Sequence, residues 1–321
     1  ALPENIIAKI EGENPEEPAL VFMSHYDSAD HSALGAADAA SGVAAILEAV
    51  RAYQTQEETP KQDIILLFTD TEEINLNGAN LFVESHPWAE NVGLVINFEA
   101  HGGNQKLIQH FAKAQPKNPF ANSLMYSVYK LLPNDTDSTI FREKANIPSI
   151  FFAFIDNHFN YHTQLDTAEN LDFASLNQQG EYALSMLNYF SSTSLTNLHS
   201  EKDNVYFNFP FLGMIHFSSS FIILLIIICF ASTLVLNYIA IQQNKVNFQH
   251  LVKSLIYALS SLIFAFVLGF FGWKIIAYLY PEYQLILHGF TYNGKSYIIA
   301  FSMLTLGLFL YFFKFFSIKI N

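Results

Sequence analysis

Histidine and carboxylate side chains recur directly after short apolar runs in roughly the first half of the chain. The candidates with metal-ligand chemistry are His25, Asp38, Glu73, Glu99 and His162, and Glu72 directly precedes one of them. Two imidazoles and three carboxylates suit two cations such as zinc, with one carboxylate bridging the ions. This set of residues therefore predicts a two-metal site that activates water for hydrolysis.

Each of these residues, taken alone, has a simpler explanation. A histidine at a strand end, such as His25, is usually structural, and Asp38 before a helix could be a helix cap. A glutamate pair such as Glu72 and Glu73 usually lies in a solvated turn. Their recurrence at successive strand ends favours the metal site. Because the single cysteine lies inside an apolar run, the chain offers no thiolate zinc site, and any ligands must be histidines and carboxylates.

The elements that must position these residues alternate between strands and helices. Continuous apolar runs, typical of strands buried on both faces, occupy residues 19–23, 64–68, 92–96 and 149–154. Helical spacing appears between and after them, in residues 43–53, 122–132 and 175–189. This alternation predicts an α/β fold with a mostly parallel sheet covered by helices on both faces. Ligands in such folds bind beyond the carboxyl ends of the strands.

Three long uncharged runs follow a polar linker at residues 191–204. They cover residues 204–244, 254–273 and 296–313. Since a membrane helix needs roughly 20 apolar residues, we expect an all-α transmembrane region of about three helices in a lipid bilayer. Apolar core helices of a soluble protein are the less favoured explanation. The expected division is an α/β domain in residues 1–200 and membrane helices in residues 201–321.

The charges of the two regions have opposite signs. Residues 1–200 carry 26 Asp and Glu against 9 Lys and Arg, whereas residues 204–321 carry six lysines and only Glu282. Phosphate binding needs a basic surface, so the acidic region argues against nucleic acid as a partner. The sequence opens at Ala1 without a basic apolar leader, so we expect a signal or anchor to have been removed or to lie outside this numbering.

The lysines near the uncharged runs predict an orientation. Lys245 and Lys253 lie in the first loop, and Lys314 and Lys319 follow the last run, whereas the second loop pairs Lys295 with an acid. By the positive-inside rule, the first loop and the last segment face the cytoplasm. The α/β domain is then expected on the non-cytoplasmic side, in the periplasm or an organelle lumen.

Six motifs occur in a fixed order between about residues 5 and 172: HYDS, GAADAASG, DTEE, NFEAHG, PNDTDSTIF and YHTQLD. Together they resemble the dizinc peptidases that include bacterial leucyl aminopeptidase and glutamate carboxypeptidase. The NFEA and NDTD versions resemble the membrane-embedded branch, the vacuolar membrane proteases and endoplasmic reticulum metallopeptidases. The resemblance implies a zinc exopeptidase-like fold, two Zn²⁺ ions per chain and a peptide substrate.

The resemblance also implies a division of the ligands. Asp38 corresponds to the carboxylate that bridges the two zinc ions. His25 and Glu99 would complete one zinc site, and Glu73 and His162 would complete the other.

Two further roles follow from the same resemblance. Glu72 corresponds to the general base, and Asp27 to the carboxylate that orients His25. The family usually has Asp or Asn where this chain has Ala39, which removes a polar neighbour of the bridging carboxylate. The resemblance further implies a cis peptide bond between Asp38 and Ala39.

The activity expected is that of a membrane-anchored metallopeptidase, most simply an aminopeptidase. Glu72 would take a proton from the attacking water and pass it to the leaving amine, without a covalent enzyme intermediate. A non-catalytic receptor or scaffold on the same fold is an alternative, although none of the expected ligands is missing. A second alternative is an enzyme that cyclises amino-terminal glutamine, which typically works with one zinc.

Overall fold

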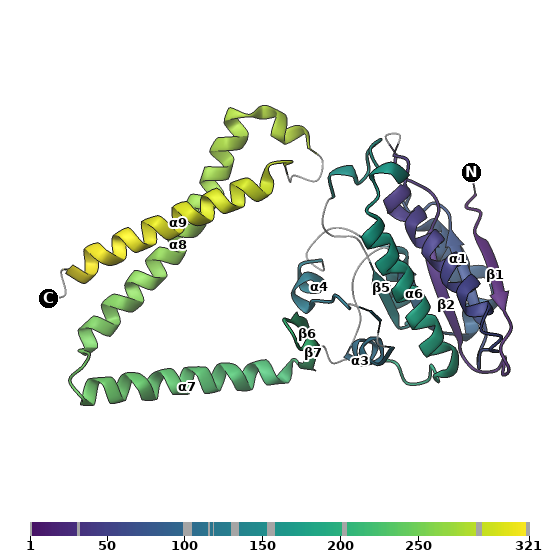
Figure 1. Ribbon diagram of the computed structural model, residues 1–321, viewed down its shortest axis with the longest axis horizontal. Coiled ribbons are helices and arrows are strands. Elements are labelled where there is room, and N and C mark those ends of the chain that lie inside the picture. Colours follow the sequence, from purple (N-terminus) through teal and green to yellow (C-terminus); the bar gives the residue numbers. More distant parts are fainter. Residues whose placement is uncertain are drawn as a thin grey trace. The chain divides into compact units, whose positions relative to one another are not determined.

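The computed structural model describes residues 2–30, 33–98, 105–114, 116–117, 119–129, 135–152, 158–200, 204–286 and 291–318. The chain divides into two compact units, Ala1–Ile223 and Leu224–Asn321. The first unit is built around a sheet and the second is helical (Figure 1).

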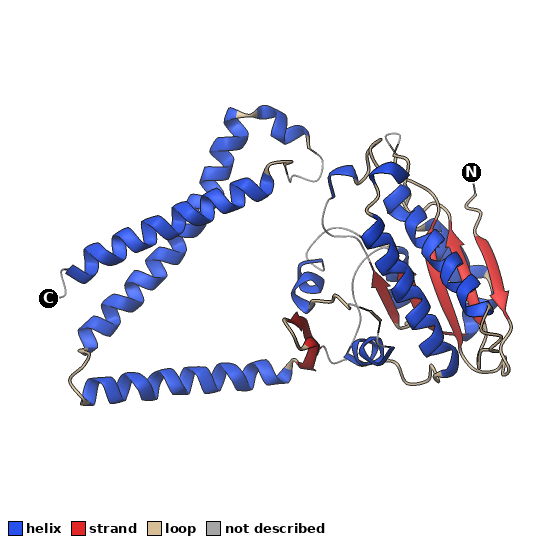
Figure 2. Cartoon of the chain, in the orientation of Figure 1, coloured by secondary structure: helices blue, strands red, loops and turns tan. Residues whose placement is uncertain are grey.

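The sheet of the first unit has five strands in the order β1-β3-β2-β4-β5. The strands are β1 Ile6–Ile10, β2 Ala19–His25, β3 Ile64–Thr69, β4 Val92–Phe98 and β5 Ser149–Phe152. All neighbouring pairs are parallel except β1, which runs antiparallel to β3 at the edge. The prediction of a mostly parallel sheet is therefore confirmed (Figure 2).

Helices cover both faces of this sheet, as predicted. The core on one face includes side chains of α1 Ser41–Gln54, α3 Gln105–Ala114 and α6 Phe173–Ser192. The core on the other face includes side chains of α2 Asn77–Ser85 and α5 Asp137–Glu143. Successive residues of a strand point to opposite faces, so Leu20 and Phe22 of β2 join the first core and Val21 and Met23 join the second. This two-sided burial explains why the strands are continuously apolar.

Helices α2, α3 and α5 were not predicted, and neither were two β-sheet parts of the first unit. Strand β1 is short and lies at an exposed edge, so it lacks the continuous apolar run that marked the buried strands. The second is a hairpin of β6 Asn204–Phe209 and β7 Gly213–Ser218, which occupies the start of the first uncharged run. Helix begins only after this hairpin. Apolar residues on both faces of these strands hide the alternation that usually identifies a hairpin.

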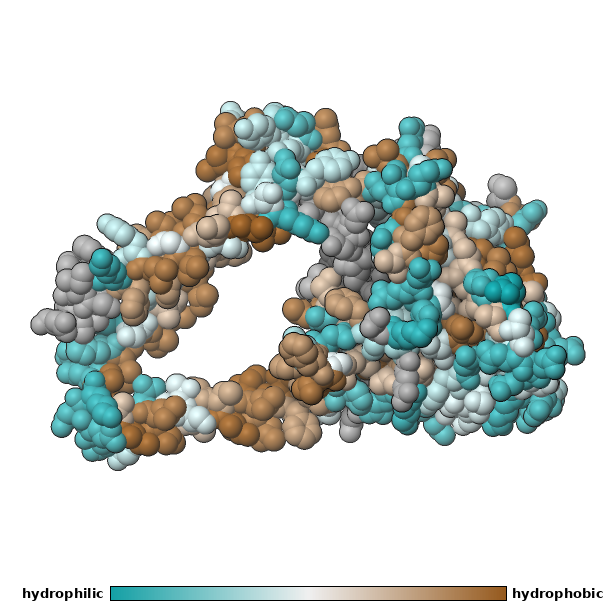
Figure 3. Space-filling view, viewed as in Figure 1, coloured by the Kyte–Doolittle hydropathy of each residue, from teal (hydrophilic) through white to brown (hydrophobic). Residues whose placement is uncertain are grey.

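The second unit contains long apolar helices. They are α7 Ser220–Gln242, whose first turn belongs to the first unit, α8 Phe248–Leu279 and α9 Gly294–Ile318. In the described part of the chain, three helices are long and apolar enough to cross a membrane, as predicted. Their apolar side chains are largely exposed (Figure 3). The Tyr257 hydroxyl of α8 donates a hydrogen bond to the Phe309 carbonyl of α9.

Candidate metal centre

The register of two parallel strands brings the first candidate residues together. His25, the last residue of β2, pairs with Thr69, the last residue of β3. Because both strands end at the same level, the segment with Glu72 and Glu73 leaves the sheet beside the loop that contains Asp27. The predicted meeting of side chains at the carboxyl edge of the sheet is thus observed.

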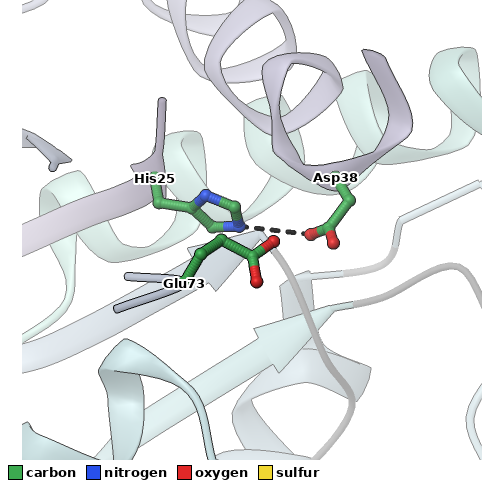
Figure 4. Close-up of side chains that lie close together, drawn as sticks. All are labelled: His25, Asp38 and Glu73. Atoms are coloured by element: carbon green, nitrogen blue, oxygen red, sulfur yellow. Dashed lines mark hydrogen bonds and ion pairs between the residues drawn. The ribbon is translucent and has the colours of Figure 1, made fainter. Parts of the chain in front are cut away.

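Three of the predicted ligands lie within metal-binding distance of one another. Ligand atoms of His25, Asp38 and Glu73 are all within 4.8 Å of each other. The His25 Nε2 atom lies 3.1 Å from Asp38 Oδ1. Figure 4 shows these three side chains converging from β2, the segment before α1 and the segment after β3.

The fourth predicted ligand, His162, lies on the other side of the Asp38 carboxylate. His162 Nε2 is 3.1 Å from Asp38 Oδ2 and 3.1 Å from Glu73 Oε1. This nitrogen is buried, yet it is not aligned for a hydrogen bond with either oxygen. A buried nitrogen that faces two carboxylates without a hydrogen bond is well suited to coordinate a cation.

The two oxygens of Asp38 therefore face different histidines. Oδ1 faces His25 and Oδ2 faces His162, an arrangement that allows one carboxylate to bridge two ions. Burial opposes ionisation of Asp38, but His162 and His25 outweigh it and hold the pKa of this carboxyl well below its usual range. Burial disfavours the charged form of His162, but Asp38 and Glu73 outweigh it and raise the pKa of His162 to about 9. The metal-free cluster thus holds a proton that a zinc ion would displace, because zinc binds neutral imidazole.

Asp27 connects His25 to the two glutamates. Its carboxylate accepts hydrogen bonds from the backbone N–H groups of Glu72, at 3.1 Å, and Glu73, at 3.2 Å. The His25 Nδ1 atom lies 3.0 Å from the Asp27 carbonyl oxygen and 3.4 Å from its carboxylate. Burial opposes ionisation of Asp27, but His25 and the two backbone N–H groups outweigh it and lower its pKa. A hydrogen on Nδ1, donated to Asp27, leaves the lone pair that a metal needs on Nε2, the nitrogen that faces Asp38.

The segment that presents Asp38 packs closely against the sheet. Gly35 has a left-handed backbone, with φ of 68°, and the Asp38–Ala39 peptide bond is cis, as the resemblance implied. The Ser24 hydroxyl donates to the Ala39 carbonyl at 3.1 Å. A side chain on Gly42 would place its Cβ 2.4 Å from Ser24 Oγ and 2.7 Å from the Phe98 carbonyl oxygen. Glycine is therefore required where α1 meets β2 and β4.

The sequence predicted no role for Asp166, whose carboxylate binds the backbone next to the Asp38 side chain. Its carboxylate accepts the N–H groups of Ala37, at 2.7 Å, and Asp38, at 3.2 Å. Asp166 is buried, and burial raises the pKa of this carboxyl. Its position in the motif YHTQLD, four residues after His162, was the only signal available in the sequence.

A second buried carboxylate lies next to the end of β3. Asp137 accepts a hydrogen bond from the Thr69 hydroxyl, and both side chains are buried. The start of α5 is capped by Thr136 together with Thr139. Asp137 therefore supports the strand end from which the glutamate segment departs.

The remaining predicted residues are Glu72 and Glu99. Glu72 is buried, and its backbone is held beside the cluster by Asp27. Glu99 lies outside the described residues, one position after the end of β4. The cluster of two imidazoles and two carboxylates fits zinc, which takes nitrogen and oxygen ligands from these side chains.

Comparison with known proteins gives a consistent family. The family model described as peptidase family M28 matches residues 5–187. Endoplasmic reticulum metallopeptidase 1 of Rattus norvegicus is 32% identical over 210 residues, which cover 61% of this chain and 23% of that protein. The vacuolar membrane protease of Clavispora lusitaniae is 28% identical over 295 residues, covering 85% of this chain and 28% of that protein. The chain thus spans about a quarter of the length of these relatives.

Solved structures also resemble part of the chain. The LapA aminopeptidase of Legionella pneumophila has a TM-score of 0.46 and 21% identity, covering 59% of this chain and 55% of that one. BSAP, a zinc aminopeptidase from Bacillus subtilis, has a TM-score of 0.44 and 19% identity, covering 57% of this chain and 49% of that one.

Proposed function

Because the chain belongs to peptidase family M28, we propose that it is a membrane-anchored, zinc-dependent peptidase and that it acts as an aminopeptidase. The observation that most directly supports this proposal is the position of Asp38 between two histidines. Each carboxylate oxygen lies 3.1 Å from one imidazole nitrogen, His25 on one side and His162 on the other.

The proposed site would hold two zinc ions. Asp38 would be shared between them, His25 and Glu99 would complete one site, and Glu73 and His162 would complete the other. Zinc, when bound, lowers the pKa of a coordinated water and polarises a carbonyl group.

The chain's own contribution to the reaction centres on Glu72. We assign it to accept a proton from the water that attacks the scissile carbonyl carbon, and to donate that proton to the amine released when the C–N bond breaks. Its burial keeps bulk water from competing for the proton. The Asp27 carboxylate accepts hydrogen bonds from the backbone N–H groups of Glu72 and Glu73, and these bonds hold the backbone on both sides of the Glu72 side chain.

Charge supports the choice of an aminopeptidase. Residues 1–200 carry 26 acidic against 9 basic side chains, and such a field attracts a positively charged peptide amino terminus. The family resemblance includes both an aminopeptidase and a carboxypeptidase, so the choice rests on the charge. The proposal extends to a location on the non-cytoplasmic side of the membrane, in the periplasm or an organelle lumen, on the basis of the lysine distribution.

A peptide-library digest by the purified full chain, read by mass spectrometry, tests this function. We expect stepwise loss of amino-terminal residues, abolished by a chelator and restored by zinc, and no cleavage of the same peptides after amino-terminal acetylation. Loss of carboxyl-terminal residues would instead identify a carboxypeptidase. Cyclisation of glutaminyl peptides without hydrolysis would identify a cyclase, and no conversion by the zinc-loaded chain would favour a non-catalytic role.

A further inference from the structure

The hairpin of β6 and β7 is apolar on the face that is turned away from the core. Tyr206 and Met214 point inward and join the first core. The register places Phe207, Ile215 and Phe217 on the opposite face, and the rings of the two phenylalanines lie 6.4 Å apart. Among the described residues, neither core cluster includes these three side chains. The outer face of an antiparallel pair is usually polar, whereas these three half-buried side chains are apolar, so the hairpin has a second, partly open apolar surface.

The tip of the hairpin continues this apolar surface. Phe211 is fully exposed, Leu212 is 71% exposed and Phe209 is 49% exposed. Among the described residues, Phe211 and Leu212 therefore leave most of their surface open to solvent, and Phe209 leaves about half. Figure 3 shows hydrophobic side chains where the hairpin leads into α7.

A neighbouring segment enlarges the patch. The Asn208 side chain donates to the Pro119 carbonyl and accepts the Ala121 N–H at 2.9 Å, which fixes residues 119–121 beside the tip. Phe120, between these two contacts, is 57% exposed. Helix α4 Ser123–Tyr129 contacts β6, and its Leu124 is 67% exposed. We call the exposed side chains of the hairpin, Phe120 and Leu124 the hairpin patch.

The two stretches of chain that form the hairpin patch contain no acidic residue. Residues 204–244 have no charged side chain, and residues 100–134 have four lysines and no Asp or Glu. Helix α3, within the second stretch, packs against both strands of the hairpin. Glu181 of α6 lies beside the second stretch, where it pairs with Lys117 at 2.9 Å. The first unit is otherwise strongly acidic, so anionic lipid headgroups would repel these two stretches less than the rest of it.

The hairpin also connects directly to the first candidate membrane span. β7 ends at Ser218 and α7 begins at Ser220. A strand of six residues is roughly 20 Å long at about 3.3 Å per residue. The whole hairpin therefore lies within reach of the membrane surface at which α7 enters.

We propose that the hairpin patch lies on the lipid bilayer, with Phe209, Phe211 and Leu212 inserted at the boundary between headgroups and acyl chains. Phenylalanine and leucine side chains of peripheral segments typically occupy this depth. The hairpin then forms a fourth membrane contact, in addition to the three apolar helices. The proposal depends on α7 crossing a membrane and is independent of peptidase activity.

Site-directed spin labelling of the full chain in vesicles of phosphatidylcholine and phosphatidylglycerol tests this proposal. Single cysteines replace Phe211 or Ile215 in a Cys229→Ser background, and each carries a nitroxide. His216→Cys is the matched control, because it is the exposed neighbour of Ile215 on the opposite face of β7. Leu47→Cys, beside Glu48 on α1 and 50% exposed, is a second control.

The labels at positions 211 and 215 should collide more often with oxygen and less often with an aqueous nickel complex than the labels at positions 47 and 216. Equal access of the nickel complex to all four positions would overturn the proposal. Protection from both reagents that increases with the protein-to-lipid ratio would also overturn it, because a second protein copy would then cover the patch. Unchanged circular dichroism and thermal unfolding of each labelled chain show that the labels leave the fold intact.

Discussion

The carboxylate of Asp166 holds the backbone of Asp38, whose own side-chain oxygens face His25 and His162. Oδ2 of Asp166 accepts the Asp38 N–H at 3.2 Å, although the two residues are 128 positions apart. Oδ1 accepts the preceding N–H of Ala37 at 2.7 Å. The segment that carries His162 thus fixes the position of the carboxylate that His162 faces.

Asp166→Ala should lower zinc affinity and activity on the order of 10-fold to 100-fold, as loss of a supporting partner behind a metal ligand typically does. Asp166→Asn should lose less, because its amide oxygen can still accept one of the two N–H groups. Competition with a chromophoric chelator measures zinc affinity, and a peptide assay measures activity. An alanine variant that binds zinc like the wild type would show that Asp38 is held by other contacts.

Replacement of Glu72 should separate catalysis from metal binding. Glu72→Gln should retain zinc and lose activity by at least roughly 100-fold to 10,000-fold, since an amide cannot accept the proton. Glu73→Gln is the matched variant, and it should lose zinc as well, because Glu73 faces His162 at 3.1 Å. Elemental analysis and kinetics on the same preparations test both. Activity of Glu72→Gln near that of the wild type would exclude the proposed proton transfer.

Zinc content should be close to two ions per chain after purification without chelator. His25→Ala and His162→Ala should each reduce this content, because each removes an imidazole that faces the shared carboxylate. His110→Ala is the control, since His110 contacts Tyr189 on the covering helices rather than the cluster. Full retention of two ions by both ligand variants would contradict the assignment.

The glycine at the start of α1 should be sensitive to a single added methyl group. Gly42→Ala should lower the free energy of unfolding by about 1–3 kcal/mol, as overpacking does, because the Cβ would meet Ser24 Oγ at 2.4 Å. Gly180→Ala should raise it by about 1 kcal/mol through helix propensity, since nothing lies within 4 Å of that Cβ in α6. Thermal unfolding of the two variants decides whether close packing at Gly42 is the reason for the glycine.

The orientation of the first unit can be read from labelling of single cysteines in a Cys229→Ser background. A cysteine at Ser200 should react with an impermeant reagent applied to the non-cytoplasmic side, and one at Gln243 should not. The lysine pairs that flank the uncharged runs give this expectation. The reverse pattern would place the first unit in the cytoplasm.

Periodicity and strand-end chemistry were sufficient to predict most of the α/β unit. β2, β3 and β4 begin at the predicted residues and extend one or two residues past the predicted ends. These strands can be recognised in the sequence because burial on both faces gives them an unbroken apolar run. β1 and the hairpin lack this signal, since an edge strand and an apolar hairpin do not follow that pattern.

The ligand types and the place of Asp27 beside His25 were predictable, whereas the support from Asp166 was not. His25, Asp38 and Glu73 belong to residue types that bind metals, and their strand-end positions imply that they meet. The contact of Asp166 with the Asp38 backbone depends on how a long loop returns to the sheet, 128 positions later. Neither spacing nor composition contains that information.

The Asp27 carboxylate also bears on thermal motion at this edge of the sheet. Its two oxygens accept hydrogen bonds from the backbone N–H groups of Glu72 and Glu73, and one of them lies 3.4 Å from His25 Nδ1. These contacts couple the loop after β2 to the segment after β3, so a displacement of one should carry the other with it. We expect fluctuations here to move His25, Glu72 and Glu73 as a group, so that their mutual distances vary less than their positions.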